Sequence, residues 1–187
     1  MLIPTATLKA VSLFAGKKDV RNYLNGVHFT RNAAGLLLVV GTNGAAVGLA
    51  ACGPVEPFEP FTVPVDTISI VLKAYGKLAS LDVTAAALEG IPFMPLEGKY
   101  PDFAQVVPST VSGTSAHFNP ELVELFYKAS KALGTRTGQI HIHQNGSDGA
   151  AVTVPYIESF IGVLMPLRDL GKNYVEPDLA AMRSRLL

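Results

Sequence analysis

The sequence predicts an α+β protein built from about three repeated units, each a helix packed on a small antiparallel sheet. Three segments carry apolar residues at helical spacing, and each is followed by two or three runs of strand-forming residues. Turn-forming residues separate these runs, and the pattern returns after about 55 residues, which is long for a solenoid repeat. Helices gathered on one face of an antiparallel sheet are the usual α+β solution.

The first unit opens with a helix near residue 5. Thr5 is placed to cap it, and its apolar residues lie roughly on one side: Leu8, Val11, Leu13 and Phe14. Strands are expected over residues 24–30, 35–42 and 45–51. The turns between them are indicated by the stretch from Asn32 to Gly35 and by Asn43 with Gly44.

The second unit begins with a short strand at residues 61–64. Asp66 is placed to cap its helix, which carries Ile68, Val71, Leu72 and Tyr75. Strand-like runs follow at residues 81–88 and 91–98.

The third unit has a short leading strand at residues 115–118. Asn119 is expected to cap the helix, and Pro120 suits its first position. Apolar residues then recur at helical spacing: Leu122, Leu125, Phe126 and Ala129. Strands are expected at residues 139–144, 149–155 and 160–166.

Composition limits the classes of function. The chain has 187 residues, is 49% hydrophobic and carries 15 basic and 15 acidic residues, so any basic surface must be local. The single Cys52 excludes an internal disulfide and a Cys-rich zinc site, and fits a reducing, cytoplasmic location. No apolar run approaches the length of a membrane span, so no membrane partner is expected.

Several phrases follow one another in this order: DVRNYLNGVHF (19–29), GLLLVVGTNGAAVGLA (35–50), FTVPVDTISIVLKAYG (61–76), LEGKYPDFAQVVP (96–108), FNPELVELFYKA (118–129) and FIGVLMPLR (160–168). Together they resemble the bacterial DNA polymerase III beta subunit, the sliding clamp. The resemblance runs from about residue 5 to 168. It implies a DNA-clamp-like fold made of half-domains, each with a helix on an antiparallel sheet.

The resemblance also implies a division of the chain. Residues 1–108 correspond to the clamp's middle domain, with two half-units, and residues 109–168 to the last half of its final domain. Residues 169–187 form a C-terminal tail beyond the family pattern. A family chain has six half-domains, so this chain is a shortened homologue. It also departs from the family at Asn43, where an aspartate is usual, and at Ala45-Ala46-Val47, which lacks the usual basic residue.

Sliding clamps capture partner peptides from polymerases or repair proteins in a hydrophobic groove. The matching positions here are Thr42, Gly44, Val47, Pro101, Gln105, Val106, Val163, Leu164, Met165, Pro166, Leu167 and Arg168. An apolar groove with a methionine suits varied peptides. The alternative is that residues 163–167 are core strand residues, as alternate ones must be. The alanines at 45 and 46 suggest altered affinity or lost partners.

Clamps also bind duplex DNA without reading its sequence, through helices that present amines to phosphates. The candidate DNA-facing residues are Lys9, Lys17, Lys18, Arg21, Lys73, Lys77, Lys128 and Lys131. The alternative is that lysines in the last turn of a helix merely complement its dipole. Their recurrence on all three helices of a neutral chain favours a modest basic face.

Three half-units leave one without a partner, which would expose apolar surface. A two-fold homodimer or a higher homo-oligomer would cover it. The run EPDLAAMRSRLL in the tail predicts a short amphipathic helix, with Leu179, Met182 and Leu186 on one face. It either packs on a groove of its own or a neighbouring subunit, or is a surface helix or disordered end.

No catalytic constellation stands out, so we expect no enzyme, no cofactor and no metal. His141 and His143 point to one sheet face and could hold a metal, but solvated strand histidines are the default. The sequence favours a DNA sliding clamp-like accessory protein of replication or repair that supports processivity, binds duplex DNA and docks peptides. The alternative is a clamp-related protein-interaction module that does not encircle DNA.

Overall fold

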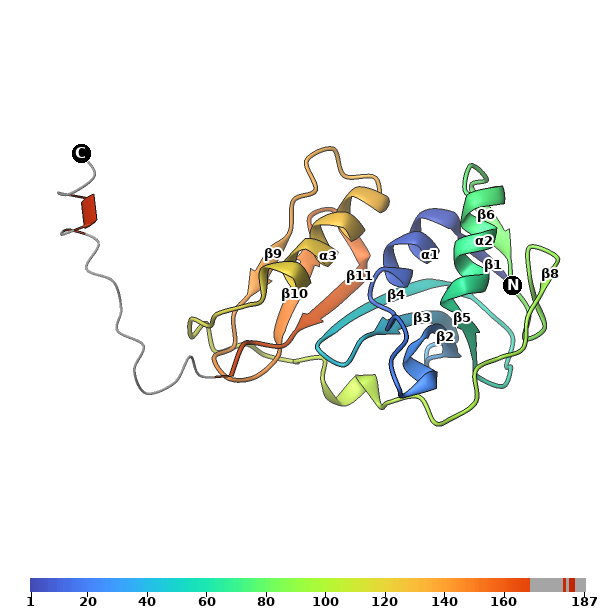
Figure 1. Cartoon of the computed structure of the whole chain (residues 1–187), viewed down its shortest axis with the longest axis horizontal. Coiled ribbons are helices and arrows are strands. Elements are labelled where there is room, and N and C mark those ends of the chain that lie inside the picture. The colour runs from blue at the N-terminus through green and yellow to red at the C-terminus, as the bar shows by residue number, and fades with distance from the viewer. Residues whose placement is uncertain (169–179, 181, 184–187) are drawn as a thin grey trace.

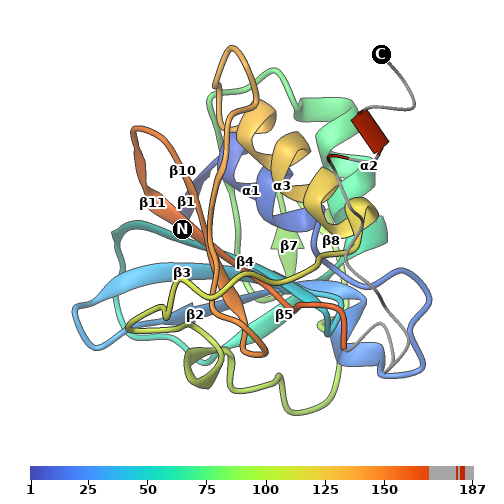
Figure 2. The ribbon, with the colours of Figure 1, turned by 90° about the vertical axis from the view of Figure 1, so that its left-hand side faces the viewer.

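The computed structural model describes residues 1–168, 180, 182 and 183. Within residues 1–168, three α-helices gather on one side of a seven-stranded antiparallel sheet (Figures 1 and 2). Helix α1 (Thr5–Ser12) contacts both α2 (Val65–Tyr75) and α3 (Pro120–Ala132). The predicted α+β class and its three helix-plus-sheet units are confirmed.

Each unit contributes a set of strands to the fold. The first has β1 (Leu2–Pro4), β2 (Gly26–Arg31), β3 (Leu36–Thr42) and β4 (Ala46–Pro54). The second has β5 (Phe61–Pro64), β6 (Ser80–Asp82), β7 (Ala87–Leu88) and β8 (Ile91–Pro92). The third has β9 (His141–His143), β10 (Ala150–Val154) and β11 (Ile157–Leu164). Two short 3-10 helices, η1 (Asn22–Leu24) and η2 (Phe103–Gln105), complete the elements.

The first and third units share one continuous sheet. Its strand order is β5-β2-β3-β4-β11-β10-β9, and the seam between the units is the antiparallel pair β4–β11. Gly48 lies opposite Gly162 in this seam. A side chain at either glycine would collide with a phenylalanine ring, Phe14 at Gly48 and Phe126 at Gly162. The centroids of the Phe14 and Phe126 rings are 4.7 Å apart, and a single hydrophobic core therefore spans the seam.

The first two units are interlocked by an exchange of strands. The strand that leads into α2, β5, pairs with β2 of the first unit, with Val63 opposite Val27. The strand that leads into α1, β1, pairs with β6 of the second unit, with Ile3 opposite Leu81. All four side chains are fully buried, so each unit completes the other's sheet.

The helix starts differ from two of the three expectations. Asn119 caps α3 as predicted, its Oδ1 accepting a hydrogen bond from the Glu121 N–H at 2.9 Å. Thr5 and Asp66 cap nothing, because Pro4 and Pro64 occupy the cap positions of α1 and α2. A proline held in extended conformation ends the preceding strand where each helix begins, and leaves no place for a side-chain cap.

The predicted strands were too long in the second unit, and in the third unit β9 and β10 are shorter than predicted while β11 begins earlier, at Ile157. The predicted strand at residues 81–88 is split between β6 and β7, and residues 115–118 form no strand. In contrast, β1 was missed, because three residues are too few for a periodic signal. The tail at residues 169–187, with its predicted helix, lies outside the described residues except for 180, 182 and 183. No helix in the described part of the chain is both long and apolar enough to cross a bilayer.

Candidate functional site

A groove lies on the sheet face opposite the helices, where the first unit meets the third. It encloses about 240 Å³ and draws on segments far apart in the sequence. Its lining residues are Arg21, Leu24, Thr42, Gly44, Ala45, Val47, Pro101, Asp102, Phe103, Val106, Val163 and Met165. Most of these side chains are apolar, and the polar ones are Arg21, Thr42 and Asp102.

One wall of the groove is the segment that connects the second and third units. Tyr100 anchors this segment, with its ring stacked on His28 at a centroid distance of 4.3 Å. The Tyr100 hydroxyl donates to the Val40 carbonyl at 3.2 Å. Burial raises the pKa of Tyr100 and lowers the pKa of His28 to about 4, so both groups are neutral at pH 7. This neutral stack fixes the connecting segment across β2 and β3.

A second wall is formed by the phrase DVRNYLN before β2. The Asp19 N–H donates to Asn25 Oδ1 and the Asn25 amide donates to the Asp19 carbonyl, both at 2.8 Å. The Arg21 guanidinium donates to both Asp19 oxygens, at 3.0 and 2.8 Å, and holds the pKa of Asp19 at about 2. These bonds lock the turn, so that Arg21 stands at the groove and Leu24 is buried at its floor. These bonds account for three polar residues of this phrase, Asp19, Arg21 and Asn25.

The hairpin between β3 and β4 supplies the third wall. Asn43 Oδ1 accepts from the N–H groups of Ala45 and Ala46, both at 2.9 Å, and so shapes the tight turn. Gly44 has a φ of +88°, and a side chain there would lie 3.0 Å from the Arg21 guanidinium. The Ala45 carbonyl accepts from the Met165 N–H at 2.9 Å, which ties the end of β11 to this turn.

The structure brings together seven of the twelve predicted groove residues. Those at the groove are Thr42, Gly44, Val47, Pro101, Val106, Val163 and Met165. Leu164 is not at the groove, because the strand alternation that turns Val163 toward the groove turns Leu164 into the core, where it is fully buried. Gln105 instead donates to Asp102 at 2.8 Å, and the lining does not include Pro166, Leu167 or Arg168.

Sequence analysis missed five lining residues: Arg21, Leu24, Ala45, Asp102 and Phe103. Arg21, one of the candidate DNA-facing residues, lies in the turn after α1, beside Gly44. The sequence did carry a signal for Arg21 and Leu24. The segment around them is dense in polar residues, and its apolar residues follow neither the helical nor the strand period.

The predicted basic residues other than Arg21 divide into three groups. Lys9 on α1 and Lys73 and Lys77 at the end of α2 line a common surface hollow and are exposed. Lys128 instead forms an ion pair with Glu124 at 2.9 Å, and Lys131 donates to the Arg136 carbonyl at 2.7 Å. Lys17 and Lys18 are exposed in the turn after α1. The three lysines that share a surface hollow therefore lie where α1 meets α2.

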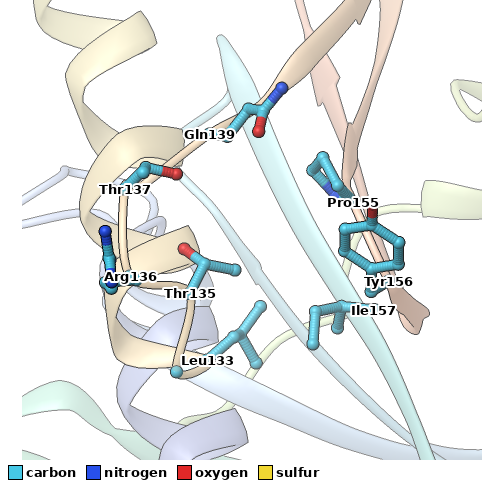
Figure 3. A pocket seen from close by; sticks show the side chains of 9 residues that line it. Leu133, Thr135, Arg136, Thr137, Gln139, Pro155, Tyr156 and Ile157 are labelled. Carbon is cyan, nitrogen blue, oxygen red and sulfur yellow. The ribbon is translucent and has the colours of Figure 1, made fainter.

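A separate hollow of about 290 Å³ lies at the outer end of the third unit (Figure 3). One side is the connection from α3 to β9, with Thr135, Arg136 and Thr137, and the other is the turn between β10 and β11, with Pro155, Tyr156 and Ile157. His141 and His143 lie beyond this connection on β9, and both are exposed. His143 Nε2 lies 2.9 Å from Thr153 Oγ1.

No family model matches the sequence, and a search of curated proteins finds no match either. Solved structures do match. The DNA polymerase III subunit beta of Borrelia burgdorferi superposes with a TM-score of 0.70 at 17% identity, over 91% of this chain and 64% of that one. The beta subunit of Thermotoga maritima gives 0.67 at 14% identity, over 90% and 65%. The sliding clamp of Pseudomonas aeruginosa gives 0.66 at 16% identity, over 90% and 66%. The chain spans about 64–66% of the length of these clamps, and its fold is that of the bacterial sliding clamp.

Proposed function

We propose that this chain is a clamp-like accessory protein of DNA replication or repair. It docks short peptides of partner proteins in the groove and contacts duplex DNA non-specifically with its helix side; it catalyses no reaction. The observation that carries the proposal is the groove, which exists only because three chain segments converge at the junction of two units.

The groove suits a short peptide better than a folded partner. About 240 Å³ accommodates one or two apolar side chains, and Val47, Val163 and Met165 offer them an apolar lining. The Met165 side chain is partly exposed and adapts to different shapes. Arg21 adds a donor near the rim that could hold a peptide carbonyl or carboxylate.

Peptide docking is tested by selecting short linear peptides from a display library and measuring their affinity for three forms of the chain. Met165→Glu places a charge in the groove and is expected to weaken binding at least about tenfold, a loss of about 1.4 kcal/mol. Leu167→Glu is the matched control, since Leu167 is similarly exposed but lies outside the lining. Equal loss in both variants, or none in either, would contradict the groove assignment.

Non-specific DNA contact requires amines that can reach phosphates. Lys9, Lys73 and Lys77 meet this condition, because they are exposed and gather at one hollow. Such binding weakens steeply with salt, by a slope of about 0.9 per phosphate contact in a plot of log K against log salt. The triple change of these lysines to glutamine is therefore expected to flatten the slope by about two to three.

The matched control is the double change Lys128→Gln and Lys131→Gln, whose amines already have partners. It is expected to alter the slope by less than about one. Anisotropy of a labelled duplex at several salt concentrations measures both variants.

The alternative function is a clamp-related interaction module that does not encircle DNA. The neutral net charge and the engaged lysines of α3 favour this possibility. It predicts peptide binding that depends on Met165 together with duplex binding too weak to show a salt slope.

We also propose self-association, because a unit of this fold is completed by a second unit. Two copies would hold six units, the content of one family chain, and further copies could close a ring.

A further inference from the structure

The third unit has a strand edge that no other strand covers in the described part of the chain. Strand β9 is the last of the seven strands and pairs only with β10. His141 and His143 are exposed, and Ile142 between them is half-buried. An open edge presents unpaired N–H and C=O groups, which a further strand can satisfy.

The first two units show which kind of segment covers the equivalent edge. Strand β2 follows α1 and β6 follows α2, as β9 follows α3. The outer edge of β2 is covered by β5, the strand that leads into α2. The edge of β6 is covered by β1, the strand that leads into α1. In both units the covering strand comes directly before the helix of the other unit.

The third unit carries the corresponding leading segment at residues 117–119, directly before α3. A hydrogen bond aligns it with β5. The Leu96 N–H donates to the Thr62 carbonyl at 3.0 Å, and the Leu167 N–H donates to the His117 carbonyl at 2.8 Å. His117 therefore corresponds to Thr62, and Phe118 to Val63. Successive residues of an extended chain turn to opposite edges, so the main-chain groups of Phe118 face away from Leu167.

We propose that two copies of this chain pair their third units by reciprocal strand exchange: residues 117–119 of each copy lie antiparallel to β9 of the other. The segment that covers the edge and the edge itself belong to the same chain, so a two-fold axis satisfies both at once. The proposal deepens the self-association proposed above and rests on the clamp-like fold, but on neither DNA binding nor peptide binding.

The sheet ladders set the register. Three strand pairs lead from β5 across the first unit to the seam: Val63 lies opposite Val27, Val27 lies opposite Gly41, and Gly41 lies opposite Gly48. In the third unit Ile142 lies opposite Val152, which lies opposite Gly162. Gly48 and Gly162 face each other across the seam, so Ile142 holds the position of Val27.

Phe118 of one copy is thus expected opposite Ile142 of the other, and His117 opposite His143. The ladder should be three residues long, like that between β1 and β6. It stops at Gln144, whose carbonyl already accepts from the Gly113 N–H of its own chain at 3.0 Å. Phe118 and Ile142 are both half-buried in the single chain, and their contact would remove both from water.

Cysteine pairing tests the register in the full-length chain. The variant His117→Cys with His143→Cys, in a Cys52→Ser background, is expected to form a disulfide-linked dimer under mild oxidation, because directly opposed strand residues fit a disulfide. His117→Cys with His141→Cys, displaced by two residues, is the matched control and should link far less. Each single variant should stay unlinked, since a two-fold axis places position 117 opposite 143 and not opposite itself.

Light scattering supplies the second measurement. The chain at micromolar concentration should have about twice its mass of 19.8 kDa, and Ile142→Pro should return it to a single copy. Proline removes an N–H from the open edge, where it is needed only between copies. Circular dichroism checks that this variant is folded.

Three results would overturn the proposal: a single-copy mass for the unchanged chain, equal linking of the two cysteine pairs, or a dimer that forms only after residues 169–187 are removed. The last result would assign the edge of β9 to the tail. Duplex binding that persists in a single-copy protein would leave the proposed function standing and remove only the strand exchange.

Discussion

The first two units and the third unit are built alike but are completed differently. The edges of β2 and β6 are each covered by a strand of the other unit, whereas the edge of β9 has no strand partner in the described residues. In the first two units, the leading strand of each unit completes the sheet of the other. The third unit has the same elements without this exchange in the described residues.

What holds the third unit in place is its contact with the first. The seam β4–β11 joins their sheets, and α1 packs against α3 above it. The Phe14 and Phe126 rings meet at 4.7 Å in this contact, each seated over a glycine of its own unit. The third unit thus depends on one neighbour, while each of the first two units also exchanges strands with the other.

The largest expected effect is on this seam. Phe126→Ala removes a fully buried ring from the contact of the first and third units, and should lower the free energy of unfolding by about 3–5 kcal/mol. Urea denaturation followed by fluorescence and circular dichroism measures the loss. Phe126→Leu keeps most of the volume and should cost less than about 1.5 kcal/mol. Similar small losses in both variants would show that the third unit does not depend on this ring.

A covered strand edge should also show in the pH dependence of stability. His28 on β2 lies beside β5, with its Nδ1 3.0 Å from Thr62 Oγ1 and its ring stacked on Tyr100, and burial lowers its pKa to about 4. In the unfolded chain His28 takes up a proton near pH 6.5, whereas in the folded chain it stays neutral until about pH 4. The contribution of neutral His28 to the free energy of unfolding is therefore complete above pH 6.5 and is lost as the pH falls toward 4. Between pH 7.5 and pH 5 the loss should be roughly 2 kcal/mol.

The variant His28→Gln removes this titration and can still bond to Thr62. Its unfolding free energy should therefore change less over the same pH range. His143 holds the corresponding place on β9, whose edge has no strand partner in the described residues, so His143→Gln is the control for replacing a strand histidine by glutamine. An unchanged profile for His28→Gln would mean that the edge of β2 is not sealed as the structure indicates.

The helices and the long strands could be predicted from the sequence, because both have a period that survives over many residues. Asn119 with Pro120 also marked the start of α3 correctly. The pairing of β1 with β6 could not be predicted, since strands of three residues carry no period and their partner lies about 80 positions away along the chain. The same limit hid the exchange of strands between the first two units.

The groove was only partly predictable for a related reason. Strand alternation should have excluded Leu164, since it cannot share a face with Val163. Arg21 could not be placed, because its position depends on hydrogen bonds that it donates to Asp19 and that form only once the turn is folded. Residues of irregular turns, such as Arg21 and Asp102, are set by tertiary contacts and not by a repeating pattern.

A smaller effect concerns how the helices begin. Helix α3 starts with a side-chain cap from Asn119, whereas α1 and α2 start after prolines that offer none. Asn119→Ala should therefore cost about 1 kcal/mol of stability, while Asn119→Asp, which retains an accepting oxygen, should cost less than half of that. Thermal unfolding of both variants checks the difference. Equal losses would assign the effect to the leading segment of the third unit and not to the cap.

The smallest effect is expected at the surface of α3. Lys128 and Glu124 form an exposed i,i+4 ion pair, and such pairs contribute only about 0.3–0.5 kcal/mol. Lys128→Gln should lower stability by no more than this at low salt and by nothing measurable at high salt, where the attraction is screened. Glu124→Gln breaks the same pair and should match it. A loss above about 1 kcal/mol that persists at high salt would mean that Lys128 also contacts a neighbouring unit. Helix α3 would then be stabilised by more than one other unit, as α1 is, even though the edge of β9 is open.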